Sequence, residues 1–173
     1  MLKVLYAYLM APTKTVQVYS HVKDWRVWWT IILVSSVVSS IKLSSIGVFQ
    51  IVSYGVLIAS YLLVSALIID GVAQIMGAES QFKTVLYWKG FAWTLFWFSP
   101  SVALIQTSFY FIGTLLGLIL NVVYAVYLWK TLMCIYKLTP WRLVAIFLWP
   151  VFFFVIFFFS LFVTLTQWVM ALV

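Results

Sequence analysis

The segment Ile69-Asp70-Gly71-Val72-Ala73-Gln74-Ile75-Met76-Gly77-Ala78-Glu79-Ser80-Gln81-Phe82-Lys83 interrupts an otherwise strongly apolar chain. It holds two of the three acidic residues in the 173-residue sequence, Asp70 and Glu79. Charged side chains and irregular backbone cost several kcal/mol in hydrocarbon, so a bilayer accepts such a segment only at its surface or where protein lines it. The pattern predicts the central cytoplasmic loop of a polytopic membrane protein, with these candidate functional residues: Asp70, Gly77, Glu79, Ser80 and Lys83.

The composition supports a membrane protein. Apolar residues make up 66% of the chain and charged residues 8%, whereas soluble domains carry about 25% charged residues. Most of the surface is therefore expected to face the lipid bilayer. The net charge of +7 is typical of lysines and arginines held on the cytoplasmic side. We expect no nucleic-acid partner, because no basic cluster exceeds two residues.

The predicted fold is all-α, a polytopic bundle of five transmembrane helices with a short N-terminal interfacial helix. Residues 1–24 form the interfacial segment, which is broken at Pro12. Residues 25–173 form the transmembrane domain, whose spans are expected at about 25–41, 46–69, 84–98, 104–129 and 142–169. Ser99-Pro100-Ser101 predicts a helix boundary. Pro150 predicts a kink near Leu148 to Pro150.

Positive charges give the expected orientation. Nine of the ten lysines and arginines fall on one side of a five-span layout, and only Lys42 falls on the other. Positive residues accumulate on the cytoplasmic side of membrane proteins. The predicted orientation of this multi-pass protein therefore has the N-terminus in the cytoplasm and the C-terminus outside.

Gly113, Gly117 and Asn121 recur at helical spacing on the expected fourth span. Small residues at this spacing let helices approach closely, and an amide can add a hydrogen bond between them. We interpret the set as a helix–helix seam, either internal or to a partner subunit, with Asn121 bonded across it. The alternative is that the two glycines share this spacing by chance.

Few polar groups could support chemistry. Asp70 lies at the unfavourable end of a helix dipole, so we expect a compensating lysine (Lys83, Lys89 or Lys130) or a solvated headgroup position. Lys83 and Lys89 are expected to snorkel to the headgroups. His21 is the only histidine and Cys134 the only cysteine. We expect no cofactor, no metal and no catalytic set, so the protein is not predicted to be an enzyme.

Three segments resemble the Yip1-domain family of five-span membrane proteins. The first runs from Leu9 through Pro12, Thr13, Thr15 and Val16 to Trp25 and Trp28-Trp29. The second is Gly77-Ala78-Glu79-Ser80-Gln81-Phe82-Lys83, which is similar to the family's glycine-rich segment but has Ala78 and Ser80 at glycine places. The third is Ser99-Pro100, followed by Tyr124, Tyr127 and Trp129. The Asp-Leu-Tyr-Gly-Pro segment of eukaryotic members is missing, so the resemblance does not imply binding of Rab-type GTPases. The compact N-terminus resembles that of prokaryotic members, which implies a location in a prokaryotic inner membrane.

The resemblance implies a small accessory subunit, because some bacterial Yip1-domain proteins accompany ABC-type exporters. The expected function is a non-enzymatic accessory or scaffolding subunit of a larger membrane complex, associated with export or trafficking. Its expected partners are the lipid bilayer and other membrane subunits, with an ABC-type exporter as one candidate. The alternative is a small membrane transporter or lipid-handling protein, which would need a polar cavity with Asn121, Gln106 or Asp70 pointing inward.

Overall fold

The computed structural model describes residues 2–19, 23–41, 47–146 and 148, and the regular structure in these ranges is entirely helical. The predicted all-α class is therefore confirmed. The elements are α1 (Leu2–Met10), α2 (Pro12–Tyr19), α3 (Trp25–Ser40), α4 (Val48–Ile75), α5 (Phe82–Trp93), η1 (Thr94–Phe98), α6 (Ser99–Ser108) and α7 (Tyr110–Tyr136). Residues 140–146 are helical as well.

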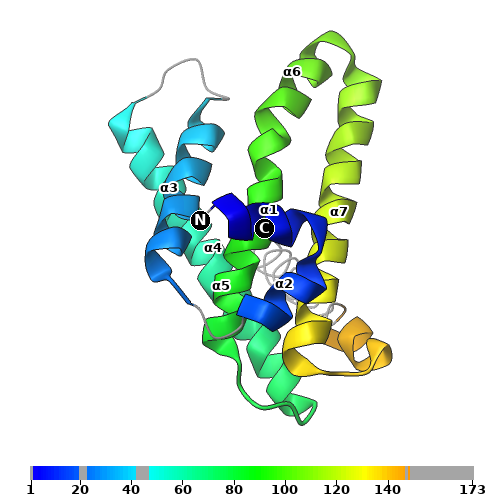
Figure 1. Ribbon diagram of the computed structural model, residues 1–173. Coiled ribbons are helices and arrows are strands. Elements are labelled where there is room, and N and C mark those ends of the chain that lie inside the picture. The colour runs from blue at the N-terminus through cyan, green and yellow to red at the C-terminus, as the bar shows by residue number, and fades with distance from the viewer. Residues whose placement is uncertain (1, 20–22, 42–46, 147, 149–173) are drawn as a thin grey trace, which may run out of the picture.

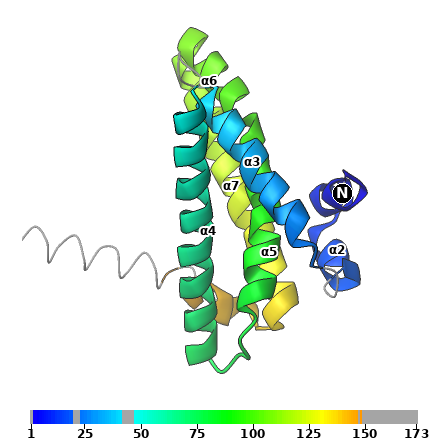
Figure 2. The same ribbon diagram turned by 90° about the vertical axis from the view of Figure 1, so that its left-hand side faces the viewer.

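The longer helices run alternately up and down (Figure 1). The chain rises through α3, descends through α4, rises again through α5, η1 and α6, and descends through α7. The short helices α1 and α2 lie on the flank of this bundle, beside α5 and α7 (Figure 2). The break between them lies at Ala11, next to the predicted Pro12.

Within the described part of the chain, two helices are long and apolar enough to cross a membrane. These are α4, with 28 residues and a mean hydropathy of 2.2, and α7, with 27 residues and a mean hydropathy of 2.1. A membrane-spanning helix needs about 20 residues. The helix α3 has 16 residues and α5 has 12. Residues 82–108 are nevertheless continuously helical, because α5, η1 and α6 follow one another without a break.

The boundary predicted at Ser99-Pro100-Ser101 is where η1 ends and α6 begins, but the chain reverses direction only at Phe109. Pro100 lies in the first turn of α6. The N–H groups of the first turn have no partner within the helix, so a proline fits there and the chain continues in the same direction. Phe109 has the non-helical backbone angles that end α6, with φ −137° and ψ 80°. The helix expected at 104–129 therefore begins at Tyr110.

The central polar segment is half helical. The helix α4 continues to Ile75, more than a turn beyond the expected end at residue 69. Asp70 and Gly71 are therefore helical, and the non-helical connection to α5 covers only 76–81. Gly77 has φ +84° there, a left-handed conformation that glycine adopts without steric cost.

The core lies where α3, α4, α5 and α7 meet, and α5 is its most enclosed helix: every residue from Thr84 to Ala92 is buried. Trp28 of α3 donates a hydrogen bond from Nε1 to the carbonyl of Leu86, at 3.1 Å. Gly90 makes this approach possible, because a Cβ there would lie 2.6 Å from Cδ1 of Trp28. The packing of α3 on α5 therefore depends on the absence of a side chain at residue 90.

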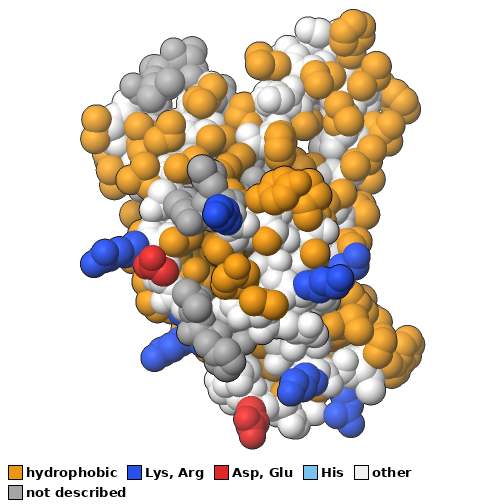
Figure 3. Space-filling model, in the orientation of Figure 1, with side chains coloured by type: hydrophobic (Ala, Val, Ile, Leu, Met, Phe, Trp, Pro, Cys, Tyr) orange, Lys and Arg blue, Asp and Glu red, His pale blue; other side chains and the backbone are white. Residues whose placement is uncertain are grey.

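Among the described side chains, none that is charged lies at one end of the face drawn in Figure 3. The end formed by α6 and the start of α7 shows hydrophobic and uncharged polar groups there, and the lysines and arginines lie toward the opposite end. The sequence explains this distribution, because residues 90–129 contain no charged residue. The two ends of the helical bundle therefore differ strongly in polarity.

Several expectations concern residues outside the described ranges. They are His21, Lys42, the kink at Pro150 and most of the fifth span, 149–169.

Candidate functional site

Asp70 forms the centre of a buried hydrogen-bond network at the charged end of the molecule. Its side chain is 4% exposed. Oδ2 accepts from Gln74 Nε2 at 2.8 Å and from Ser80 Oγ at 2.7 Å. Oδ1 accepts from the backbone N–H of Gln81 at 2.7 Å and from the hydroxyl of Tyr136. Four donors satisfy the buried carboxylate, and together they join α4, the 76–81 connection and the last turn of α7.

The expected lysine partners are not among these donors. Lys83 and Lys130 are exposed, and Lys89 donates to Ser65 of α4 instead. A lysine partner was expected because Asp70 was placed at the end of its helix. Asp70 instead lies more than a turn before the end of α4. The connection after α4 folds back and supplies neutral hydrogen-bond donors to its carboxylate. Of the other predicted loop residues, Glu79 is exposed and Ser80 donates a hydrogen bond to Asp70.

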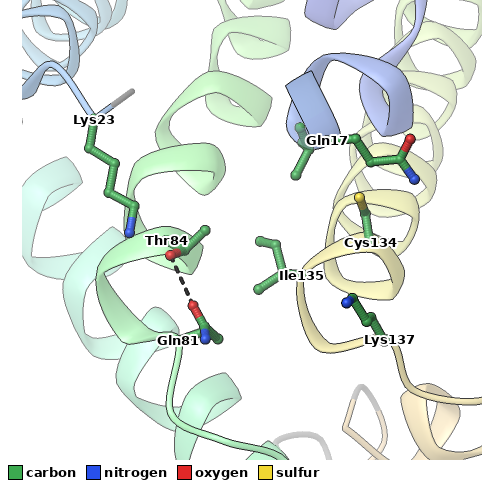
Figure 4. Close-up of a pocket in the computed structure, with 8 residues that line it drawn as sticks. Gln17, Lys23, Gln81, Thr84, Cys134, Ile135 and Lys137 are labelled. Atoms are coloured by element: carbon green, nitrogen blue, oxygen red, sulfur yellow. Dashed lines mark hydrogen bonds between the residues drawn. The ribbon is translucent and has the colours of Figure 1, made fainter. Parts of the chain in front are cut away.

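Beside this network lie two adjoining cavities, which we call together the lysine pocket; Figure 4 shows the first of them. The first has a volume of about 460 Å³ and is lined by Val16, Gln17, Lys23, Gln81, Thr84, Cys134, Ile135 and Lys137. The second has a volume of about 410 Å³ and is lined by Lys23, Ser80, Gln81, Phe82, Lys83 and Thr84. No acidic side chain is among these described lining residues.

The lining side chains approach from three helices and from the segment before α3. In Figure 4, Lys23 extends toward Thr84 at the start of α5, while Cys134 and Lys137 face the cavity from the end of α7. Thr84 Oγ1 donates to Gln81 Oε1 at 3.2 Å. Lys137 has φ +51°, and this left-handed residue ends α7.

The Asp70 network positions this pocket. Asp70 holds the backbone of Gln81, and Gln81 also lines both cavities. Asp70 also holds Tyr136, the residue directly before Lys137. Gln81 and the residue before Lys137 are therefore both hydrogen-bonded to one carboxylate.

Lys89 is a second buried charged residue, at 2% exposure. Its Nζ donates to Ser65 Oγ and lies 5.1 Å from the ring centroid of Tyr61, within the range of a cation–π interaction. The expectation that Lys89 snorkels to the headgroups is wrong for this structure, because its ammonium group points into the packing between α4 and α5.

Tyr8 fastens the flanking helix α1 to the bundle. Its side chain is fully buried, its hydroxyl shares a hydrogen bond with Thr131 Oγ1 at 2.8 Å, and its ring stacks on Trp88. Burial raises the pKa of the Tyr8 phenol well above its ordinary value, because the charged form would lose its hydration. The hydroxyl therefore stays protonated and available to Thr131.

The seam predicted at Gly113, Gly117 and Asn121 is occupied by α6 of the same chain. A Cβ at Gly113 would overlap the Cα of Gln106, and one at Gly117 would lie 3.8 Å from Cγ1 of Val102. Asn121 Nδ2 donates to the carbonyl of Gly117 at 2.8 Å. This bond lies within α7, and not across the seam as predicted. A further interface to a partner subunit at these residues stays a prediction.

The lysine pocket was not predicted from the sequence. Lys23 and Lys137 were counted only as orientation signals, and they are far apart in the chain. Gln81 lies in the segment that resembles the Yip1-domain family but was not singled out as a site residue, and Thr84 belongs to no recognised motif. The sequence offered one signal for this pocket: these residues all fall at helix ends on the side of the predicted bundle where the lysines and arginines gather. Among the described residues, no group of three or more His, Cys, Asp or Glu side chains could hold a metal ion.

Comparison with known proteins finds no family model, curated protein or solved structure that matches this chain.

Proposed function

We propose that the protein is a multi-pass membrane protein that acts as a non-enzymatic accessory or scaffolding subunit of a larger membrane complex. The observation that carries this proposal is an apolar groove between α3 and α4. The groove has a volume of about 470 Å³ and is lined by Trp29, Ile32, Leu33, Ser36, Ile51, Val52, Gly55, Val56, Ala59 and Ser60. Small residues form part of its lining, and small residues are enriched where membrane helices pack.

The rim of the groove is exposed and apolar. Trp29 is 60% exposed, Leu33 62% and Val56 60%. In a bilayer this surface contacts lipid or another helix. A partner helix would fill the groove with van der Waals contacts, which drive helix association where the hydrophobic effect is absent. We therefore assign the groove to a transmembrane helix of a partner subunit.

The charge distribution supports a five-span arrangement with the basic end in the cytoplasm. Nine of the ten lysines and arginines lie in the described residues, and residues 90–129 carry none. The continuous helical segment 82–108 supplies the length of a third span. A prokaryotic inner-membrane protein of Yip1-like type, working beside an exporter or trafficking complex, fits this layout.

The rival function, a small transporter, needs a polar cavity with Asn121, Gln106 or Asp70 pointing inward. Gln106 and Asn121 line a cavity of about 310 Å³ between α6 and α7. Asp70 is not among the residues that line it, and four donors occupy its carboxylate. The cavity lined by Gln106 and Asn121 is the observation that favours the transporter, while the carboxylate of Asp70 is engaged elsewhere and takes no part in that cavity.

The proposal is tested with the full chain expressed in its native membrane and purified in mild detergent. We expect a complex with a second membrane protein, and we expect Ser60→Leu to reduce its yield, because the added side chain fills the groove. Ala125→Leu is the matched control, since it adds the same bulk at an exposed position of α7. A lone monodisperse wild-type monomer, or equal yields for the two variants, contradicts the proposal.

A further inference from the structure

Three lysines converge on the lysine pocket without a carboxylate among its described lining residues. Lys23 lines both cavities, Lys137 closes the first and Lys83 closes the second. Like charges that share a cavity repel each other, and a bound anion would offset that repulsion. Asp70 lies behind Gln81, but its two oxygens are turned toward the four donors described above.

The pocket also offers neutral hydrogen-bonding groups. Gln81 and Thr84 belong to the beginning of α5. The positive end of the helix dipole attracts anions, while the backbone N–H groups of Gln81 and Thr84 themselves are bonded to Asp70 and to the carbonyl of Gln81. Phosphate carries several strong acceptor oxygens, which suit a combination of ammonium groups and neutral donors.

The position of the pocket indicates a ligand at the membrane surface. Lys23 precedes the start of α3, where Trp25, Trp28 and Trp29 cluster. Tryptophans are enriched at the headgroup level of membranes. Basic pockets between transmembrane helices on the cytoplasmic side bind anionic headgroups. A volume of about 460 Å³ lies within the usual range for small-molecule sites.

From these observations we infer that the lysine pocket binds a phosphate-bearing anion, of the kind carried by an anionic phospholipid headgroup. Lys23, Lys83 and Lys137 bind the phosphate oxygens, and Thr84 lies beside them. Val16 and Ile135 provide apolar contacts at the edge of the first cavity. This inference concerns a different surface from the α3–α4 groove; it rests on the proposed membrane location and orientation, but not on the accessory-subunit role.

The pocket contains its own reporter, because Cys134 is the only cysteine in the chain and lines the first cavity. The experiment measures the rate at which maleimide labels Cys134 in the full chain in detergent micelles. The added probes are dioctanoyl phosphatidic acid, dioctanoyl phosphatidylcholine, inorganic phosphate and a glutamate-rich decapeptide. The two lipids have the same acyl chains, so they differ only in the headgroup.

We expect phosphatidic acid to slow the labelling in a saturable way and phosphatidylcholine to leave it unchanged. Lys23→Gln and Lys137→Gln should each weaken this protection by about tenfold in apparent affinity, the loss expected for one charge-assisted hydrogen bond. Lys130→Gln is the matched control, because it removes an exposed lysine of the same helix that lines neither cavity. It should behave like the wild-type chain.

Protection by inorganic phosphate at similar concentrations would support the same site with a soluble phosphate compound as its source. Equal protection by both lipids overturns the inference, and so does equal weakening by Lys130→Gln. Protection by the acidic peptide alone also overturns it, since the pocket would then recognise a protein segment. Circular dichroism of each variant establishes that the helices are intact before labelling is compared.

Discussion

Asp70 of α4 and Tyr136 of α7, 66 positions apart in the sequence, share a buried hydrogen bond that joins the ends of the two longest described helices. The phenol is one of four donors to the same carboxylate. Hydrogen bonds to charged groups are stronger than neutral ones. The bond therefore couples the position of α7 to the connection between α4 and α5.

Tyr136→Phe should lower the free energy of unfolding by about 1–3 kcal/mol, because it removes one donor from a buried carboxylate. Denaturant unfolding in detergent, followed by tryptophan fluorescence, measures this change. Tyr110→Phe is the control, since Tyr110 lies on the same helix and is 75% exposed. Equal stability of the two variants would mean that the Asp70–Tyr136 bond contributes nothing.

Gly113→Ala should destabilise the α6–α7 hairpin strongly, because the added Cβ meets the backbone of Gln106. Clashes with backbone atoms require a shift of the helices and typically cost about 1–3 kcal/mol or more. Gly117→Ala is the internal comparison: its Cβ meets only a side-chain methyl at ordinary contact distance, so it should be tolerated. Thermal unfolding of both variants measures the difference. A Gly117→Ala variant less stable than Gly113→Ala would contradict the described seam.

Lys89→Met should raise the unfolding temperature. Lys89 is buried, and its partners Ser65 and Tyr61 carry no negative charge. An apolar side chain of similar length avoids the cost of burying the ammonium group. Lys130→Met, at an exposed position of α7, should change the temperature little. A clear loss of stability in Lys89→Met would show that the hydrogen bond to Ser65 outweighs the desolvation.

The proposed topology places residues 79 and 109 on opposite sides of the membrane. Glu79 and Phe109 are both exposed and lie in the connections at opposite ends of α5, η1 and α6. In a Cys134→Ala background, we expect Phe109→Cys to react with an impermeant maleimide in intact cells. Glu79→Cys should react only after the membrane is opened. Labelling of both from one side would reject a membrane-crossing segment between them.

Sequence patterns predicted the helices better than they predicted how the chain turns between them. Hydropathy and the tryptophans at 25, 28 and 29 located α3, and Pro12 located the break before α2. The turn at Phe109 was missed because it contains neither glycine nor proline, while Pro100 gave a turn signal inside a continuous helical segment. Local propensity is a weak guide where tertiary packing decides.

The candidate site was only partly predictable for a related reason. Asp70, Ser80 and Lys83 were singled out because they are polar in an apolar sequence. Their hydrogen-bond partners were not predicted, because Tyr136 and Lys137 come from a distant part of the chain. Whether a lysine such as Lys89 points outward or inward depends on the neighbouring helix, which composition alone does not describe.

The five 3₁₀ residues Thr94–Phe98 also change which side of the helical segment faces its neighbours. A 3₁₀ helix turns 120° per residue and an α-helix 100°, so five such residues add a rotation of about 100°. Above them α6 is accordingly turned so that Gln106 meets Gly113. Adding or deleting a single residue between 94 and 98 would swing that contact round the helix axis, so this short stretch sets the alignment of the whole α6–α7 pair.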